Sequence, residues 1–420
     1  MITERDKITA ICREEILAVW RRMPTSFPDF FSDGDIVETD QKLENQELLS
    51  VFSEKTKKMA MIKNPKKGEE KEWAIQWERE VEAFVNEEKI IGIKNSMPEE
   101  MFQSCKESVK QFVRGAFSFD EEISLSQIWQ AMRNYLIYVM IAALQGEKAD
   151  ADDPILAYSL LYPYTDNYID DALVTQEAKR QYNALIARRL QGQAVSPQNL
   201  LEEQTCRLLD MVLSQYQGEQ QKEIAGVLLL LLEAQQDSIQ QQKAADLSAK
   251  KIEEISVYKG GTSVLADYLL VTNDYEEKEV RFYLAFGFIL QMVDDLQDIA
   301  EDEKDRSSTL MTTAQKEGRL EENVNRLLWF TKEIIQNFEP RDEILHNFVL
   351  RHCLGITMIS VARNANLFSK AYLKTIEPYL PFTMKFFRKR GKEKAQEKQS
   401  KKGQEMEKEL LKKLKEFVNI

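Results

Sequence analysis

The sequence predicts an all-α protein, a bundle of about a dozen helices. Apolar residues recur three and four positions apart along most of the chain, which is the period of an amphipathic helix. Of 420 residues only 15 are Gly and 10 are Pro, and Leu, Gln, Glu, Lys and Ala dominate, which favours helices over a many-turned β-fold. Neither strand-length alternation nor a fixed-period repeat is found. The apolar share of 43% is enough for a sizeable core.

The expected helices follow one another with short breaks. The first covers residues 1–25 and ends at Pro24 and Pro28, because proline lacks an N–H and restricts the residue before it. Residues 40–112 carry apolar side chains at helical spacing, with a charged break at 64–68. The others are expected over residues 124–145, 154–171, 175–190, 199–216, 221–245, 247–258, 262–272, 276–304, 318–337, 341–368 and 370–388.

Two apolar stretches predict buried helices. Residues 227–232 form the longest aliphatic run, which is far shorter than the roughly 20 residues of a membrane span and fits the centre of a core helix. Residues 282–293 are apolar almost all round, the pattern of a helix enclosed by others.

Three regions are expected along the chain. Residues 1–112 form an N-terminal helical region that packs on or caps the core, residues 113–385 form the core, and residues 386–420 form a basic tail. Apolar residues between 406 and 418 recur on one face of this tail, and such a basic amphipathic helix suits an anionic membrane surface. A solvated helix, or one that packs on the protein itself, is the simpler alternative.

Charge and cysteine content argue against several classes. With 57 Lys and Arg against 70 Asp and Glu, the net charge of −13 disfavours nucleic acid as a partner. The four cysteines lie far apart without a Cys-x-x-Cys pair, as expected for reduced thiols rather than a disulfide framework or a zinc knuckle. No apolar signal-peptide region follows Met1. The expected location is the cytoplasm, with peripheral membrane contact through the tail as an open alternative.

Two acidic clusters, each following an apolar stretch, carry the functional signal. The first comprises Asp166, Asp170 and Asp171, and the second comprises Asp294, Asp295, Asp298 and Asp302. Residues at i and i+4 share a helix face, so carboxylates of like charge stack one turn apart, which destabilises a helix. Mg²⁺ would compensate them, since it prefers oxygen ligands and shares them with substrate phosphates. One such cluster fits a solvated acidic surface, whereas two with the same spacing favour a metal site.

The second cluster resembles a known motif. Gln291-x-x-Asp294-Asp295-x-x-Asp298 is similar to the second aspartate-rich motif of trans-isoprenyl diphosphate synthases. A longer form that extends to Asp302 also resembles the second motif of squalene and phytoene synthases.

The first cluster resembles the partner motif. Asp166-x-x-x-Asp170-Asp171 is similar to the first motif of squalene and phytoene synthases, and also to a D-D-x-x-D motif in which Asn167 takes the second position. Residues 120–315 thus resemble the class I isoprenoid synthase superfamily, which includes the bacterial large-terpene synthases.

The resemblance implies a fold and a metal site. It implies a helical bundle around a central apolar cavity, with the two clusters facing each other across its mouth and three Mg²⁺ ions joining them to a prenyl diphosphate. The implied catalytic residues are Asp166, Asp170, Asp294 and Asp298, and the implied metal ligands are these four with Asp171, Asp295 and Asp302. Metal ions and basic side chains stabilise the departing diphosphate. A dry aromatic pocket stabilises the carbocation.

Further residues complete the expected site. Lys259-Gly260-Gly261-Thr262 resembles a helix-breaking element that contacts diphosphate in chain-elongating synthases, where a break would expose N–H donors beside a lysine charge. Lys259 is therefore expected to bind diphosphate. Arg306 is expected to do so as well, because it lies just past the second cluster. The expected pocket residues are Tyr158, Tyr162 and Gln291.

Departures from the family pattern narrow the activity. The chain lacks the Gly-Gly-Lys-x-x-Arg element of chain elongators, of which Arg133 is a faint remnant, and the arginine pair that usually follows D-D-x-x-D. The expected activity is a terpene synthase that releases diphosphate and then cyclises the allylic cation or eliminates a proton from it. The alternatives are a head-to-head prenyltransferase and a catalytically inactive helical scaffold. A homodimer stays open.

Overall fold

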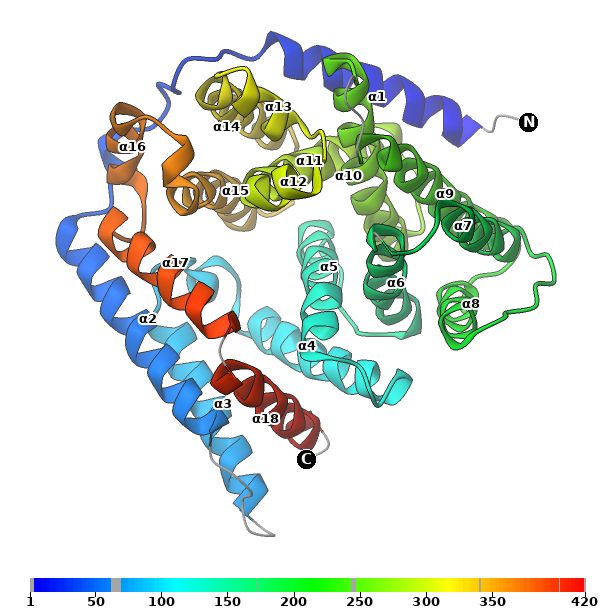
Figure 1. Cartoon of the computed structure of the whole chain (residues 1–420), viewed down its shortest axis with the longest axis horizontal. Coiled ribbons are helices and arrows are strands. Elements are labelled where there is room, and N and C mark those ends of the chain that lie inside the picture. Colours follow the sequence, from blue (N-terminus) through cyan, green and yellow to red (C-terminus); the bar gives the residue numbers. More distant parts are fainter. Residues whose placement is uncertain are drawn as a thin grey trace. The chain divides into compact units, whose positions relative to one another are not determined.

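The computed structural model describes residues 4–61, 69–171, 173–242, 247–339, 341–399 and 401–418. Over these residues the chain forms α-helices and short 3₁₀-helices and no β-strand (Figure 1), which confirms the all-α prediction. The charged break expected at 64–68 lies outside the described residues.

The chain divides by its contacts into two units. Unit 1 comprises Met1–Pro28 and Gln127–Thr357, and unit 2 comprises Asp29–Ser126 and Met358–Ile420. Both acidic clusters belong to unit 1, and so does the first helix. The regional boundaries at residues 112 and 385 stay a prediction.

Over the described residues, twelve α-helices contribute to unit 1. They are α1 (Glu4–Arg22), α5 (Leu125–Gln145), α6 (Asp153–Asp170), α7 (Gln176–Leu190), α8 (Leu200–Leu213), α9 (Gly218–Ser238), α10 (Ala249–Thr272), α11 (Glu277–Gln297), α12 (Ile299–Asp305), α13 (Leu310–Lys316), α14 (Leu320–Gln336) and α15 (Glu343–Arg363), of which α5 and α15 extend beyond the unit in sequence. Between residues 124 and 213 the helices begin and end close to where the apolar pattern predicts. The helix expected over 276–304 is interrupted at Asp298, where α11 ends and α12 follows.

The helices α10 and α11 form the centre of unit 1 and lie side by side (Figure 1). The helix break predicted at Gly260 and Gly261 is wrong, because α10 runs through both residues. These glycines instead permit a close approach. A Cβ added to Gly260 would overlap the carbonyl oxygen of Gly287 and lie 2.6 Å from the Cβ of Gln291, and one added to Gly261 would lie 2.9 Å from Leu284 Cδ2. Glycine weakens a helix, but without a Cβ it lets two backbones meet.

Aromatic side chains close the core around this crossing. The ring of Trp20 in α1 meets Phe288 of α11 and Phe330 of α14 edge to face, with centroids 5.4 and 5.6 Å apart. Residues 282–289 of α11 are all buried, and five of the six residues 227–232 in α9 are buried as well. Both predictions of buried helices are confirmed.

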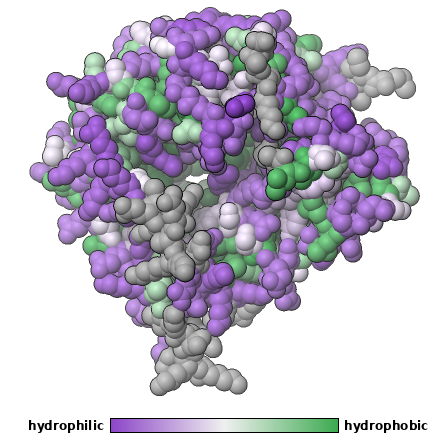
Figure 2. Space-filling model, in the orientation of Figure 1, coloured by the Kyte–Doolittle hydropathy of each residue, from purple (hydrophilic) through white to green (hydrophobic). Residues whose placement is uncertain are grey.

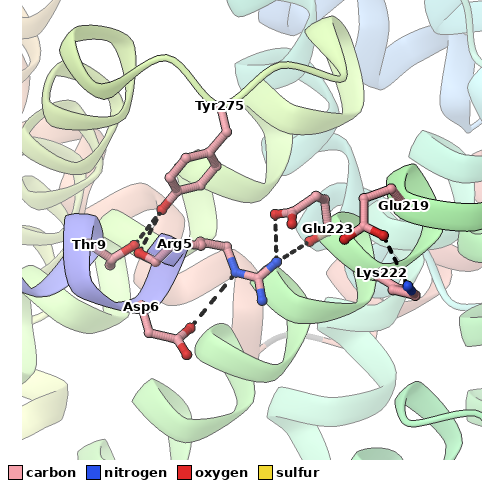
Figure 3. A network of polar contacts seen from close by, with 7 residues as sticks. All are labelled: Arg5, Asp6, Thr9, Glu219, Lys222, Glu223 and Tyr275. Atoms are coloured by element: carbon pink, nitrogen blue, oxygen red, sulfur yellow. Dashed lines mark hydrogen bonds and ion pairs between the residues drawn. The ribbon is translucent and has the colours of Figure 1, made fainter. Parts of the chain in front are cut away.

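Polar contacts attach α1 to its neighbours (Figure 3). The guanidinium of Arg5 donates to the Glu223 carboxylate of α9 at 2.7 Å. The hydroxyls of Thr9 and Tyr275 lie 2.5 Å apart, and Tyr275 also donates to the carbonyl of Arg5. Tyr275 lies between α10 and α11, so the first turns of α1 are fixed both to α9 and to the loop that precedes α11.

Unit 2 contains the C-terminal tail. Its helices are α2 (Thr39–Ala60), α3 (Glu69–Glu87), α4 (Glu99–Phe119), α16 (Lys370–Ile376), α17 (Met384–Gln399) and α18 (Lys401–Val418). Lys413 of α18 is 2% exposed, and its ammonium donates to the carbonyls of Met59 (2.6 Å) and Ala60 (3.2 Å) at the C-terminus of α2, where a cation complements the helix dipole. The tail therefore packs on its own chain, as the simpler alternative predicts, and its membrane contact stays a prediction.

The face of the molecule drawn in Figure 2 is largely hydrophilic, with apolar residues in separate patches. Among the described helices, α15 alone is long and apolar enough to cross a membrane by length and composition, and half of its most apolar window is buried. A core helix of a soluble protein meets the same criterion, so this helix is weak support for a span.

Candidate functional site

The second acidic cluster lies at the junction of α11 and α12. The N–H of Asp298 donates to the carbonyl of Asp294 at 3.0 Å, and the carbonyl of Asp298 accepts from the N–H groups of Glu301 and Asp302 at 2.8 and 2.9 Å. Asp294 and Asp298 are exposed, whereas Asp295 is buried. The junction therefore carries carboxylates on both its exposed and its buried side.

Asp295 is the most constrained carboxylate of this cluster. It accepts a hydrogen bond from Gln291 Nε2 at 2.8 Å, while its Oδ2 is buried without a hydrogen-bond partner. Burial raises the pKa of Asp295 to about 8. The Gln291 bond opposes this shift, Asp302 and Asp294 add to it, and Lys259 opposes it. A buried carboxylate oxygen of this kind is a position where a cation would be stabilising.

Asp302 shares this electrostatic environment. Burial raises its pKa to about 7, Asp298 and Asp294 raise it further, and Lys259 lowers it. Lys259 thus opposes the rise in the pKa of both Asp295 and Asp302, as expected for groups that converge on one site.

Two cations lie near the second cluster. Lys259 is half-buried on α10, so the structure puts it in a helix and not at the helix break that the sequence predicted. Arg133 of α5 lies with Nη1 3.7 Å from Asp294 Oδ1, and both side chains are largely exposed. Sequence reasoning treated Arg133 only as a remnant of another motif, because no local pattern shows which helix lies opposite it.

The first cluster is arranged differently. Asp166 is half-buried, and its Oδ1 accepts from Gln235 Nε2 of α9 at 2.9 Å and more weakly from Thr165 Oγ1 at 3.4 Å. Asp171 is exposed, follows the last residue of α6, and accepts the backbone N–H two residues later. The side chain of Asp170 lies outside the described part of the structure.

The two pocket tyrosines point from α6 toward α10. Tyr158 donates to the carbonyl of Ser263 at 2.9 Å, the hydroxyls of Tyr162 and Ser263 Oγ lie 2.6 Å apart, and the two phenols are 2.9 Å from each other. Burial raises the pKa of both tyrosines far above the ordinary range, so both stay neutral hydroxyls. Ser263 is one turn after Lys259 on α10. This helix therefore contacts α6, which carries the first cluster, and also carries Lys259, the lysine near the second cluster.

An apolar cavity of about 40 Å³ adjoins these tyrosines. Its lining comprises Tyr158, Leu161, Tyr162, Thr165, Ile186, Leu190, Leu209, Leu228, Leu231, Leu232 and Gln235. A small-molecule pocket typically measures about 300–1,000 Å³, so a prenyl chain would require the helices around this cavity to separate. Gln291, which we expected in the pocket, instead binds Asp295.

A buried polar group links three helices beside the tyrosines. Asn134 Nδ2 of α5 lies 3.2 Å from Ser159 Oγ of α6 and 3.2 Å from Asp267 Oδ1 of α10. Asp267 is fully buried with Oδ2 unpartnered, and burial raises its pKa well above the usual range. The sequence analysis missed this group, although an aspartate within an apolar helical stretch is a signal that could have found it.

The fit to a metal ion is partial. Over the described residues, no three carboxylate, imidazole or thiolate groups already meet at one point as metal ligands would. The donors are nonetheless hard oxygens, and Asp295 Oδ2 has no competing partner. Arg306, expected on the diphosphate, is exposed and ends α12 in a left-handed conformation with φ 57°. Side-chain rotation at the α11–α12 junction would be needed to complete a Mg²⁺ site.

Comparisons of the chain with family models, with curated proteins and with solved structures find no match. A function is therefore inferred from the residues and their geometry.

Proposed function

We propose that this chain is a Mg²⁺-dependent terpene synthase with a class I isoprenoid synthase fold. The strongest support is that the carboxylates of the second cluster lie near Lys259 of α10. The same helix contacts α6, the helix of the first cluster, through the hydrogen bond between Ser263 and Tyr162. Mutual repulsion and burial keep two of these carboxyls from ionising readily, and a divalent cation would relieve both.

The proposed roles of these residues follow from their exposure. Asp294, Asp298 and Asp302 would hold Mg²⁺ from one side and Asp166 and Asp170 from the other. Bound Mg²⁺ supplies positive charge to the departing diphosphate. Lys259, Arg133 and Arg306 would add point charges for the diphosphate. Tyr158 and Tyr162, both neutral, would present aromatic faces to the allylic cation and exclude water.

One observation favours a second candidate, a helical scaffold without catalysis. The cavity beside the first cluster measures only about 40 Å³. A scaffold would keep this cavity small in solution, whereas an enzyme would open it when substrate and metal bind.

The deciding experiment is diphosphate release from prenyl diphosphates of increasing chain length, with and without isopentenyl diphosphate, in Mg²⁺ and in EDTA. We expect Mg²⁺-dependent release from a single prenyl diphosphate, which also identifies the chain length. Release that requires two substrates would indicate a prenyltransferase. No release from any substrate would contradict the proposal and favour the scaffold.

The raised pKa values predict how Mg²⁺ and pH act on stability. The stability that the neutral Asp295 and Asp302 provide is fully present below their ordinary pKa of 3.8 and is lost as pH rises through about 7 and 8. We expect the Tm of the metal-free protein to fall over this window. Mg²⁺ should raise the Tm more at the alkaline end, where Asp302 is ionised and free to bind metal and the charge of Asp295 adds to the attraction. Thermal unfolding in EDTA and in Mg²⁺ across this pH range measures both effects. Asp295→Asn should flatten the profile in EDTA, and a Mg²⁺ effect independent of pH would contradict the prediction.

A further inference from the structure

A second, polar cavity lies between α7 and the end of α9. It measures about 410 Å³, within the usual range of roughly 300–1,000 Å³ for ligand pockets. Its polar lining comprises Gln176, Lys179, Arg180 and Asn183 of α7 with Gln236 of α9 and Gln240 of the 3₁₀-helix η3 (Ile239–Gln241), and no acidic residue lines it among the described residues. None of these residues belongs to the acidic clusters.

Two of the lining residues are buried without partners. Lys179 and Asn183 are one turn apart on the same face of α7, and each is 2% exposed. Within the part of the chain that the structure describes, the backbone N–H of Lys179 donates to the carbonyl of Thr175, but its ammonium has no hydrogen bond or ion pair, and Asn183 Oδ1 is buried without a hydrogen-bond partner. The side chain of Lys179 is thus largely enclosed while its ammonium has no opposite charge, which is unfavourable, so its retention points to a charge that arrives with a ligand.

The surroundings favour an anion. Of the two acidic residues beside the cavity in sequence, Glu177 pairs with the lining residue Arg180 at 2.9 Å, and Asp237 pairs with Lys251 at 3.3 Å. Over the described residues, Lys179 is therefore the lining cation that has no acidic partner. Gln176 is the first residue of α7, so the cavity also borders the positive end of a helix of 15 residues. The side-chain amide of Asn183 can present its NH₂ group after a flip, which would donate to an anionic oxygen.

We propose that this cavity binds a phosphate-bearing polar small molecule, independently of the acidic clusters. The phosphate would lie on Lys179 and Asn183, because lysine acts as a point charge for phosphate and several N–H donors match its oxygens. The glutamine amides would bind the uncharged remainder, since the cavity is larger than a bare ion requires.

The test uses the full-length protein in EDTA, where the acidic clusters cannot bind diphosphate through Mg²⁺. Inorganic phosphate and glycerol 3-phosphate are titrated by calorimetry and by thermal unfolding, with acetate at equal ionic strength as the comparison anion. We expect both phosphates to bind saturably and to raise the Tm, and acetate to have no such effect. Tighter binding of glycerol 3-phosphate than of phosphate would identify an organic phosphate as the ligand class, and equal binding would identify the free ion.

The variants separate a binding role from a structural one. Lys179→Met should raise the Tm of the unliganded protein, because it removes an unpartnered buried charge, and should weaken phosphate binding at least about tenfold. Asn183→Leu should weaken phosphate binding and also change the Tm of the unliganded protein. The control is Lys222→Met on α9, which removes an exposed pair with Glu219 and should change neither phosphate binding nor the Tm. The proposal is overturned if neither phosphate binds saturably, if acetate binds equally well, or if Lys179→Met binds phosphate like the wild type. These results do not depend on whether the chain releases diphosphate.

Discussion

Diphosphate release from the preferred prenyl diphosphate is expected to fall at least about a hundredfold in Asp294→Ala and in Asp166→Ala, the scale on which loss of one electrostatic stabiliser acts. Each substitution removes a proposed Mg²⁺ ligand from a different cluster. If both clusters hold the metal, either substitution alone should abolish most of the diphosphate release. Among the described residues, Asp294 forms an ion pair with Arg133 at 3.7 Å; both side chains are largely exposed, so this pair is worth roughly 0–1 kcal/mol. Asp166→Ala removes the hydrogen bond from Gln235, worth about 1 kcal/mol, and the weaker one from Thr165. Neither loss should unfold the chain.

Steady-state assays at saturating Mg²⁺ measure the effect, with thermal unfolding to confirm that each variant folds. The matched control is Asp210→Ala on α8, which removes an exposed carboxylate that pairs with Arg189 in the same unit. We expect the control to keep wild-type release. Retained release in both cluster variants would overturn the site assignment, and loss in only one would show that a single cluster holds the metal.

The second large effect is expected on stability, in Gly287→Ala. A Cβ on Gly287 would overlap the carbonyl of Gly260 and approach the Cα of Gly261 within 2.8 Å, and backbone cannot rotate away as a side chain can. Overpacking of this kind costs about 1–3 kcal/mol and occasionally more, which outweighs the roughly 1 kcal/mol that alanine gains over glycine in a helix. We expect a clear fall in Tm, together with displacement of Gln291, whose Cβ also lies against Gly260.

Gly355→Ala provides the control for this prediction. Gly355 is also within a helix, α15, but a Cβ there would meet nothing within 4 Å. Alanine at this position should stabilise by about 0.5–1 kcal/mol through helix propensity alone. Similar Tm shifts in the two variants would contradict the close crossing of α10 and α11.

The small apolar cavity and the polar cavity differ in whether the protein must rearrange before a ligand binds. The first is beside the proposed catalytic carboxylates and has to widen before a prenyl chain enters, so substrate binding there should be slow relative to simple docking. The second is already of ligand size and contains a buried cation, so its anion should bind without rearrangement. Stopped-flow binding kinetics would distinguish the two.

Local sequence pattern was sufficient for the class of the fold. Helical spacing of apolar residues predicted the all-α chain, and the all-round apolar stretches correctly marked the buried parts of α9 and α11. It failed at Gly260 and Gly261, where a glycine pair was taken for a break. A helix tolerates glycine when another backbone needs the space, and only the position of Gly287 reveals that need.

The sequence by itself determined the all-α class, the helix bounds between residues 124 and 213, and the acidic clusters with their spacing, because those properties depend on residues a few positions apart. Only the tertiary structure decided which groups from distant helices meet. It brought Arg133 to Asp294, Gln235 to Asp166 and Lys259 to the α11–α12 junction, and it buried Lys179 without a partner. The physical reason is that a helix period specifies a face, whereas the partner of that face depends on packing between segments far apart in the chain.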